Sequence, residues 1–197
     1  MSHLARRRLS IIATTVAVLV APAAASAATY TVKPGDGVCG GGDLQCGGLA
    51  EAATAVNAGA GGDTITVAAG AYPGATFNVG GLTITGVPGV VATSTISFTA
   101  GAVSKLTRVA VLQTGAADAV RVTGGLGLEL SDALVVSQNG SGVLLSSGTN
   151  NKIIRSAITS GTGTAISISA AAGVPVSLLS ESTLAAGGST GISAVTL

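Results

Sequence analysis

The chain has 197 residues, of which 47% are hydrophobic and 9% are charged, and its formal net charge is +1. This length suits one domain with a sizeable buried core. Binding to nucleic acid or to a membrane surface needs clustered Lys and Arg, and beyond the first ten residues the basic residues are scattered. We therefore expect neither a nucleic-acid partner nor membrane insertion.

The N-terminal 27 residues are typical of a secretory signal peptide. Three arginines at positions 6–8 form a positive segment, residues 11–20 form a short apolar run, and residues 25–27 (Ala-Ser-Ala) fit a cleavage site. The apolar run is too short for a permanent membrane helix, and no later run reaches the roughly 18–20 residues that such a helix needs. We expect cleavage near Ala27, a mature chain that begins at about Ala28, and a secreted or cell-surface protein.

Residues 28–62 are expected to form an N-terminal cap, in which residues 30–32 alternate like a first strand. Cys39 and Cys46 lie close together, and an oxidising compartment favours a disulfide that closes a small loop. Free thiols are the alternative, because two cysteines without His cannot complete a zinc site. From Leu49 to residue 58 apolar residues recur at helical spacing, which predicts a short amphipathic helix that ends at Gly59.

Residues 63–197 are expected to form β coils, because the pattern there contains only short strands. Residues 64–67 read as a strand that follows a turn, and residues 69–74 (Ala-Gly-Ala-Tyr-Pro-Gly) read as a turn. Further strands are expected at residues 76–79, 82–85 and 91–98. These runs of two to five apolar or β-branched residues are separated by Gly, Ser, Asn or Thr.

From Lys105 onward the chain repeats one pattern four times. The repeats open at Lys105, Glu129, Lys152 and Leu178, with steps of 24, 23 and 26 residues. A period near 24 residues with about three short strands per repeat is typical of a parallel β-helix, in which each turn of the chain stacks on the previous one. The sequence therefore predicts an all-β solenoid of about five coils with a short capping helix at its N-terminal end.

Stacking in register predicts columns of equivalent residues spaced by roughly 4.8 Å. Three columns are uniformly aliphatic, as the inward-facing positions of a solenoid require: Leu106, Leu130, Ile153 and Leu179; Val111, Val135, Ile158 and Leu184; Val120, Val143, Ile166 and Ile192.

Two further columns carry charges that alternate in sign along the stack. They form what we call the charge ladder: Lys105, Arg108, Glu129, Asp132, Lys152, Arg155 and Glu181. One interpretation is a surface salt-bridge ladder that helps to hold neighbouring coils in register. The other is a charged strip that holds an acidic glycan, although paired and cancelling charges leave little net field for a ligand.

The chain resembles secreted right-handed parallel β-helix proteins of the pectate-lyase-like superfamily. Residues 62–67 (Gly-Asp-Thr-Ile-Thr-Val), 69–72 and 82–86 look like the entry strands of that group. The preceding part, including Cys46 and residues 49–52, is similar to the cap of bacterial surface proteins with a Cys-Ser-Leu-Arg-Glu-Ala motif. Here residues 47–48 (Gly-Gly) replace the Ser of that motif and Ala50 replaces its Arg. The resemblance implies a right-handed coil, and this fold hosts lyases, hydrolases and adhesins.

Catalysis would have to use carboxylates and arginines, because the only His, His3, lies in the predicted signal peptide. A glycoside hydrolase of this fold needs two carboxylates that face a cleft, and the candidate acids in the coils are Asp118, Glu129, Asp132 and Glu181. A pectate-lyase-like elimination would cast Arg108, Asp132 and Arg155 around a calcium ion, although one acid between two cations is a poor calcium site. We expect no metal or other cofactor outside that lyase alternative.

These observations favour an exported, non-enzymatic β-helix with a structural, adhesive or glycan-binding role outside the cell. The alternative is a polysaccharide lyase or glycoside hydrolase that acts on an acidic polysaccharide. Expected partners are polysaccharides or cell-surface glycans. The last residues, 192–197, end inside a coil without a polar cap, so we also expect a fragment of a longer β-helix or self-association through that open end.

Overall fold

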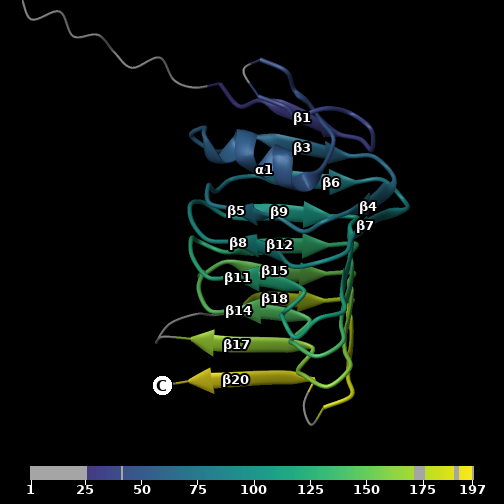
Figure 1. The fold of residues 1–197 in the computed structure, drawn as a ribbon. Coiled ribbons are helices and arrows are strands. Elements are labelled where there is room, and N and C mark those ends of the chain that lie inside the picture. The colour runs from purple at the N-terminus through teal and green to yellow at the C-terminus, as the bar shows by residue number, and fades with distance from the viewer. Residues whose placement is uncertain (1–25, 41, 171–175, 189–190, 197) are drawn as a thin grey trace, which may run out of the picture.

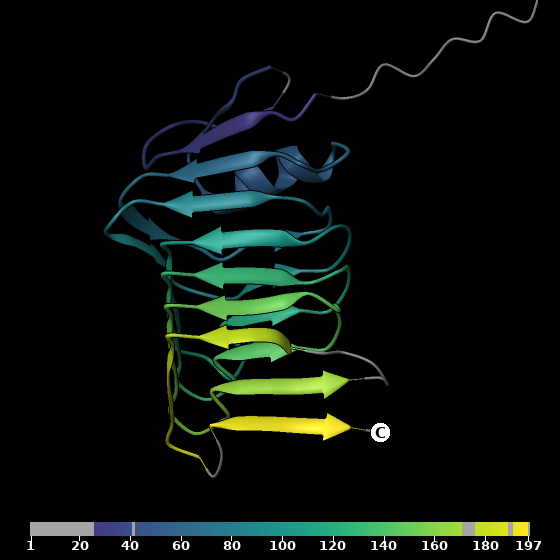
Figure 2. The same cartoon turned by 180° about the vertical axis from the view of Figure 1, so that it is seen from behind.

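The computed structural model describes residues 26–40, 42–170, 176–188 and 191–196, and these residues form a parallel β-solenoid of about five turns with one helix. Three parallel sheets run along the stack, and each full turn of the chain adds one strand to each sheet (Figure 1). Seen from behind, the strands of the first sheet lie one below another like rungs (Figure 2). The parallel solenoid predicted from the repeat is confirmed.

The strands of each sheet follow in stacking order. The first sheet contains β2 (Gln45–Cys46), β1 (Thr29–Val32), β3 (Thr64–Val67), β6 (Thr83–Gly86), β9 (Ser104–Thr107), β12 (Leu128–Ser131), β15 (Asn151–Ile154) and β18 (Val176–Ser180). The second contains β4 (Gly70–Tyr72), β7 (Val90–Ala92), β10 (Ala110–Gln113), β13 (Leu134–Ser137), β16 (Ala157–Ser160) and β19 (Thr183–Ala186). The third contains β5 (Thr76–Phe77), β8 (Ile96–Phe98), β11 (Val120–Val122), β14 (Val143–Leu145), β17 (Ile166–Ala170) and β20 (Ile192–Thr196).

The register of the strands confirms all three predicted aliphatic columns. In the first sheet Leu130 pairs with Leu106 on one side and with Ile153 on the other, and Ile153 pairs with Leu179. The columns through Val135 and Val143 are in register in the second and third sheets in the same way. Their members are buried in the middle turns. These ladders of side chains are the core of the solenoid, because each apolar residue packs on its equivalents one turn above and below.

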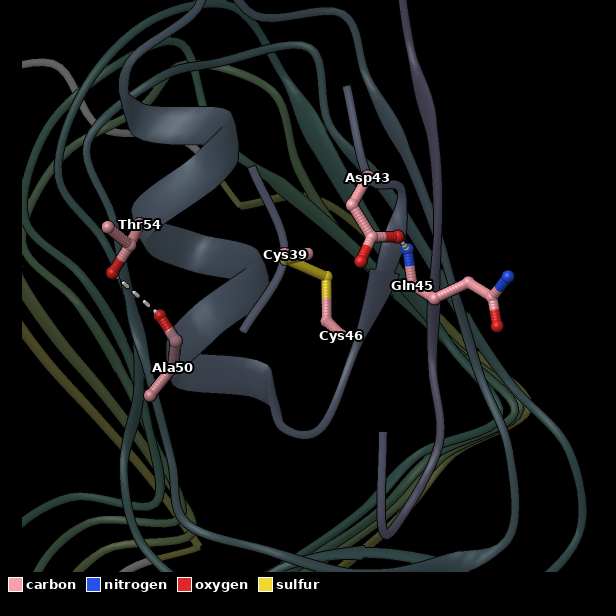
Figure 3. The surroundings of a disulfide bond; sticks show 6 residues. All are labelled: Cys39, Asp43, Gln45, Cys46, Ala50 and Thr54. Atoms are coloured by element: carbon pink, nitrogen blue, oxygen red, sulfur yellow. Dashed lines mark hydrogen bonds between the residues drawn. A yellow bond between two sulfur atoms is a disulfide. The ribbon is translucent and has the colours of Figure 1, made fainter. Parts of the chain in front are cut away.

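The N-terminal cap consists of β1, β2 and helix α1 (Leu49–Asn57). The helix buries the face that its sequence pattern predicts, through Leu49, Ala52, Ala53 and Val56, and it ends at Asn57, two residues before the expected end at Gly59. The predicted disulfide between Cys39 and Cys46 is present, and Figure 3 shows it beside α1. Both cysteines are buried, so this bond ties the loop before β2 to the cap core.

Two expectations for the first turns are wrong. Residues 69–74 were expected to be a turn, but Gly70–Tyr72 form strand β4, which pairs with β7 and opens the second sheet. Residues 91–98 were expected to be one strand, but they contain β7 and β8, which belong to different sheets. In both cases the backbone conformation is set by pairing with the next turn and not by the local turn-forming residues.

The four aromatic side chains belong to the early turns. Tyr72, Phe77 and Phe98 are buried, Tyr30 is partly buried against the core, and the rings of Phe77 and Phe98 stack with their centroids 5.6 Å apart. Burial raises the pKa of the Tyr72 hydroxyl, and the nearby Asp36 carboxylate raises it further. These aromatic residues fill the core beneath the cap.

Candidate functional site

The corner between the first and second sheets is built by four charged residues in the left-handed backbone conformation. Arg108, Asp132, Arg155 and Glu181 have φ angles of 56°, 52°, 44° and 51°, and they are the only non-glycine residues with positive φ in the described chain. Each one directly follows a strand of the first sheet. The Arg108 N–H donates to the Ser131 carbonyl at 3.0 Å and the Asp132 N–H donates to the Ile154 carbonyl at 3.1 Å, so the backbone ladder continues through the corner.

This conformation costs an ordinary L-residue free energy, and Asp tolerates it better than Arg or Glu because its short side chain can bond locally. The same turn recurs in four successive coils, and the backbone hydrogen bonds to the next coil hold it. As a result, four charged side chains leave the solenoid at one corner, one above another. These four residues, Arg108, Asp132, Arg155 and Glu181, are one of the two columns of the charge ladder.

The strongest contact in the charge ladder joins Asp132 to Arg155. Arg155 Nε lies 2.7 Å from Asp132 Oδ1 and Arg155 Nη2 lies 2.8 Å from Oδ2, so both carboxylate oxygens accept from one guanidinium. These hydrogen bonds lower the pKa of Asp132 below its ordinary value, partial desolvation opposes the shift, and the charges of Arg155 and Arg108 add to it. The same hydrogen bonds raise the pKa of Arg155.

The second column of the charge ladder lies on the face of the first sheet. Glu129 pairs in register with Lys105 and with Lys152, and its two carboxylate oxygens face the two ammonium groups. The Lys105 Nζ is 3.7 Å from Glu129 Oε1 and the Lys152 Nζ is 4.0 Å from Oε2. In this part of the column one acid therefore lies between two bases.

The charge ladder is less continuous than its sequence pattern. Among the described contacts no ion pair within 4.0 Å joins Arg108 to Asp132, or Arg155 to Glu181, although both pairs occupy neighbouring turns. The Arg108 charge still acts on the Asp132 carboxylate through space, and the Glu181 charge acts on the Arg155 guanidinium. Arg108 is thus an exposed cation that makes no ion pair within 4.0 Å among the residues that the structure describes.

A shallow depression of about 270 Å³ lies beside Arg108 and Asp132. Its other walls are aliphatic or small, and they include Val87, Pro88 and Leu134. Val87 and Leu134 are exposed, so the depression joins a charged edge to an apolar floor. A second depression, of about 340 Å³, lies between α1 and the third sheet, and its lining contains no charged side chain.

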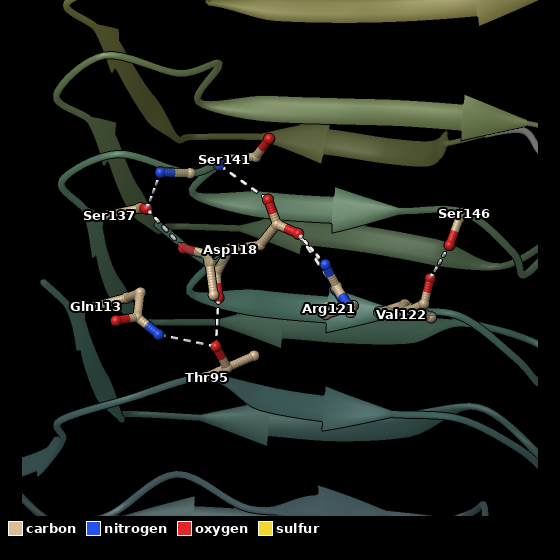
Figure 4. Close-up of polar contacts among 10 residues, drawn as sticks. Thr95, Gln113, Asp118, Arg121, Val122, Ser137, Ser141 and Ser146 are labelled. Atoms are coloured by element: carbon tan, nitrogen blue, oxygen red, sulfur yellow. Dashed lines mark hydrogen bonds and ion pairs between the residues drawn. The ribbon is translucent and has the colours of Figure 1, made fainter. Parts of the chain in front are cut away.

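Asp118, another candidate acid, belongs to a structural network just before strand β11 of the third sheet (Figure 4). Its Oδ2 accepts from Arg121 Nη2 at 3.0 Å, and its Oδ1 accepts from the Ser141 N–H of the next turn at 2.9 Å. The Thr95 hydroxyl of the previous turn donates to the Asp118 carbonyl at 2.7 Å. Asp118 therefore ties three successive turns together and has both oxygens occupied.

The residues present do not fit the calcium site that the lyase alternative would need. Calcium prefers a cluster of oxygen ligands, and the described residues contain no group of three or more His, Cys, Asp or Glu side chains that could hold a metal. Both oxygens of Asp132 already accept from Arg155. We derive no reaction through a metal at this site.

Sequence reasoning missed Asn57, the last residue of α1. Its Nδ2 donates to the Thr76 carbonyl at 2.9 Å, and its Oδ1 accepts from the Asn78 N–H at 2.7 Å. These are the two hydrogen bonds that a residue of a further parallel strand would make with β5. A polar residue at the end of a helix, two residues before a glycine, gives no signal of this role, because its partners are about twenty residues away.

The chain matches no model of a protein family, no curated protein and no solved structure. No helix in the described residues has the length and apolar character to span a membrane. The fold and the corner therefore define the chain as a parallel β-solenoid with a charge-paired corner.

Proposed function

We propose that the chain is an exported right-handed parallel β-helix of the pectate-lyase-like type, which acts outside the cell as a non-enzymatic structural or adhesive module. The observation that carries this proposal is the bidentate contact between Asp132 and Arg155. A general acid must carry a proton, whereas the hydrogen bonds from Arg155 lower the pKa of Asp132, the acid that lines the depression, and so favour its charged form. The contact serves to hold two turns together.

The buried disulfide of the cap supports the proposed export, because disulfides persist in oxidising compartments. The regular stack of short strands supports a structural role, since a solenoid offers a long rigid surface. The proposed adhesive contact is the depression beside Arg108, where an exposed guanidinium meets an aliphatic floor. A guanidinium recognises a carboxylate well, so the ligand class that fits is an acidic polysaccharide or cell-surface glycan.

Export and binding can be tested in one series. The full chain with a C-terminal tag is produced in a bacterial host, and the tag is probed on intact cells and in the medium. The processed protein is then titrated with polygalacturonate by calorimetry. We expect binding that Arg108→Ala weakens and that Arg121→Ala, which removes an arginine on another sheet, leaves unchanged.

The same samples test the lyase alternative. Polygalacturonate is incubated with the protein and calcium, and formation of unsaturated uronate is followed by ultraviolet absorbance. We expect no turnover. Turnover that Arg155→Ala abolishes would support the lyase and overturn our ranking of the two functions.

We also propose that the chain can self-associate through the turn formed by β18, β19 and β20. This turn exposes Leu179 and Ile192, whose equivalents in earlier turns include the fully buried Leu130 and Val143. Exposed apolar residues at unpaired strand edges invite pairing with another chain. Light scattering over a range of concentrations should show association that Leu179→Lys reduces, and a concentration-independent monomer would contradict the proposal.

A further inference from the structure

Asp63 is a buried carboxylate at the entrance to β3, and its side chain contacts the residue at which the mature chain is expected to begin. It is only 6% exposed. The Ala28 backbone nitrogen donates to Asp63 Oδ1 at 2.7 Å, and the Thr64 N–H donates to the Ala28 carbonyl at 2.8 Å. Ala28 is therefore held through both of its backbone polar groups just before β1 begins.

The surroundings of Asp63 call for a positive charge. A buried carboxylate is costly unless it is paired with a cation, and none of the ion pairs among the described residues includes Asp63. Its Oδ2 lies close to Gly59, two residues after the last residue of α1. The C-terminal end of a helix carries a partial negative charge, which adds to the demand for a cation at this place.

The expected cleavage site supplies that cation. Ser26 and Ala27 are exposed, so the bond between Ala27 and Ala28 is open to a protease. Hydrolysis of this bond consumes one water molecule and leaves a carboxylate on Ala27 and an amine on Ala28, which takes up the released proton. The Ala28 nitrogen, which donates one hydrogen bond as a neutral amide, would then be an ammonium group with three donors.

We propose that Asp63 is the receptor for the amino terminus that forms when the export signal is removed after Ala27, so that processing creates a buried ion pair between Ala28 and Asp63. This inference rests on the proposed export. The pair joins β1 to β3 and thereby fastens the cap onto the first coil. Processing adds a full positive charge to the donor of a hydrogen bond that already has a carboxylate acceptor, so the cap is held more firmly after processing than before.

The test uses the full chain exported by a bacterial host and purified in its processed form. Intact mass and N-terminal sequencing identify the first residue, which we expect to be Ala28. The α-amine is then acylated at neutral pH and the rate is followed by mass spectrometry. We expect the wild-type amine to react about tenfold more slowly than that of Asp63→Asn, as for a hydrogen bond to a charged group. Asp43→Asn removes an exposed acid of the same cap and should react like the wild type.

A second measurement needs no variant. The rate for the wild-type amine is compared with that of a free peptide of the same first five residues (Ala-Thr-Tyr-Thr-Val), and we again expect about a tenfold slower reaction in the protein. Processing at Ala28 with equal rates in protein and peptide overturns the inference and leaves the proposed function standing. Export with processing at another bond also overturns the inference alone, and a chain that is neither exported nor processed overturns the proposed function as well.

Discussion

The side chain of Asn57 closes the N-terminal edge of the third sheet, and this role can be tested by removing it. In Asn57→Ala the Thr76 carbonyl and the Asn78 N–H lose their partners. Each hydrogen bond contributes roughly 0.5–1.5 kcal/mol net. Water can reach this exposed edge, and Ala favours the helix by about 0.5 kcal/mol over Asn. We therefore expect a loss of about 1–2 kcal/mol in the free energy of unfolding.

For a domain of this size that loss corresponds to a decrease of about 2–8 °C in the melting temperature. Thermal unfolding followed by circular dichroism measures it, and hydrogen exchange measures the local effect. The amide of Asn78 should exchange faster in Asn57→Ala, because its acceptor has been removed. Asn57→Asp keeps that acceptor but cannot donate to Thr76, so it should also be destabilised at neutral pH.

The matched control is Thr54→Ala, on the exposed side of the same helix. The Thr54 hydroxyl donates only to the Ala50 carbonyl within α1, at 3.0 Å. Its removal should change the free energy of unfolding by no more than about 0.5 kcal/mol. If Asn57→Ala and Thr54→Ala melt at the same temperature, and the exchange of the Asn78 amide is unchanged, the interpretation of Asn57 as a strand substitute is refuted.

Three further predictions concern the corner, the cap and the core. The pKa of Asp132 is lowered in the folded state, so its ion pair stabilises the protein fully above about pH 4, and this stabilisation is lost as the pH falls further. Asp132→Asn should therefore be less stable than the wild type at pH 7. The difference in the free energy of unfolding should disappear in acid and become smaller in high salt, and an unchanged difference would contradict this prediction. Cys39→Ser opens a loop of sequence separation 7 and should cost about 2–3 kcal/mol in urea unfolding, whereas reductant should not affect that variant. Leu130→Ala empties a fully buried position between two ladder neighbours and should cost about 2–5 kcal/mol, and a loss below 1 kcal/mol would mean that the turns collapse around the cavity.

The repeat made the register of the core predictable from the sequence. Equivalent residues recur with a nearly constant step, and parallel stacking places equivalent residues of successive turns next to each other. The columns through Leu130, Val135 and Val143 could therefore be predicted from the sequence. The signal peptide, by contrast, lies mostly outside the described residues and stays a prediction. The amphipathic helix and the disulfide were also accessible, because both depend on residues close in sequence.

The parts that sequence patterns missed depend on pairing with another turn. Turn-forming residues lie in and next to Gly70–Tyr72, yet this segment is a strand because it pairs with β7. The charge pattern placed Asp132 and Arg155 in one column, but nothing in that pattern showed that the backbone there is left-handed. Asn151 is fully buried, with hydrogen bonds to three backbone groups, although its type is usually exposed.

The solenoid, its coil length and the identity of its inner columns are specified by the residue pattern, since they follow from periodicity and from the burial of like residues. Which polar groups meet depends on the folded chain: Asn57 meets the edge of β5, Ala28 meets Asp63, and Asp132 pairs with Arg155 rather than with Arg108. Apolar burial has no direction, so it follows from composition and spacing. A hydrogen bond or ion pair depends on where two side chains from distant turns arrive, within a few tenths of an ångström.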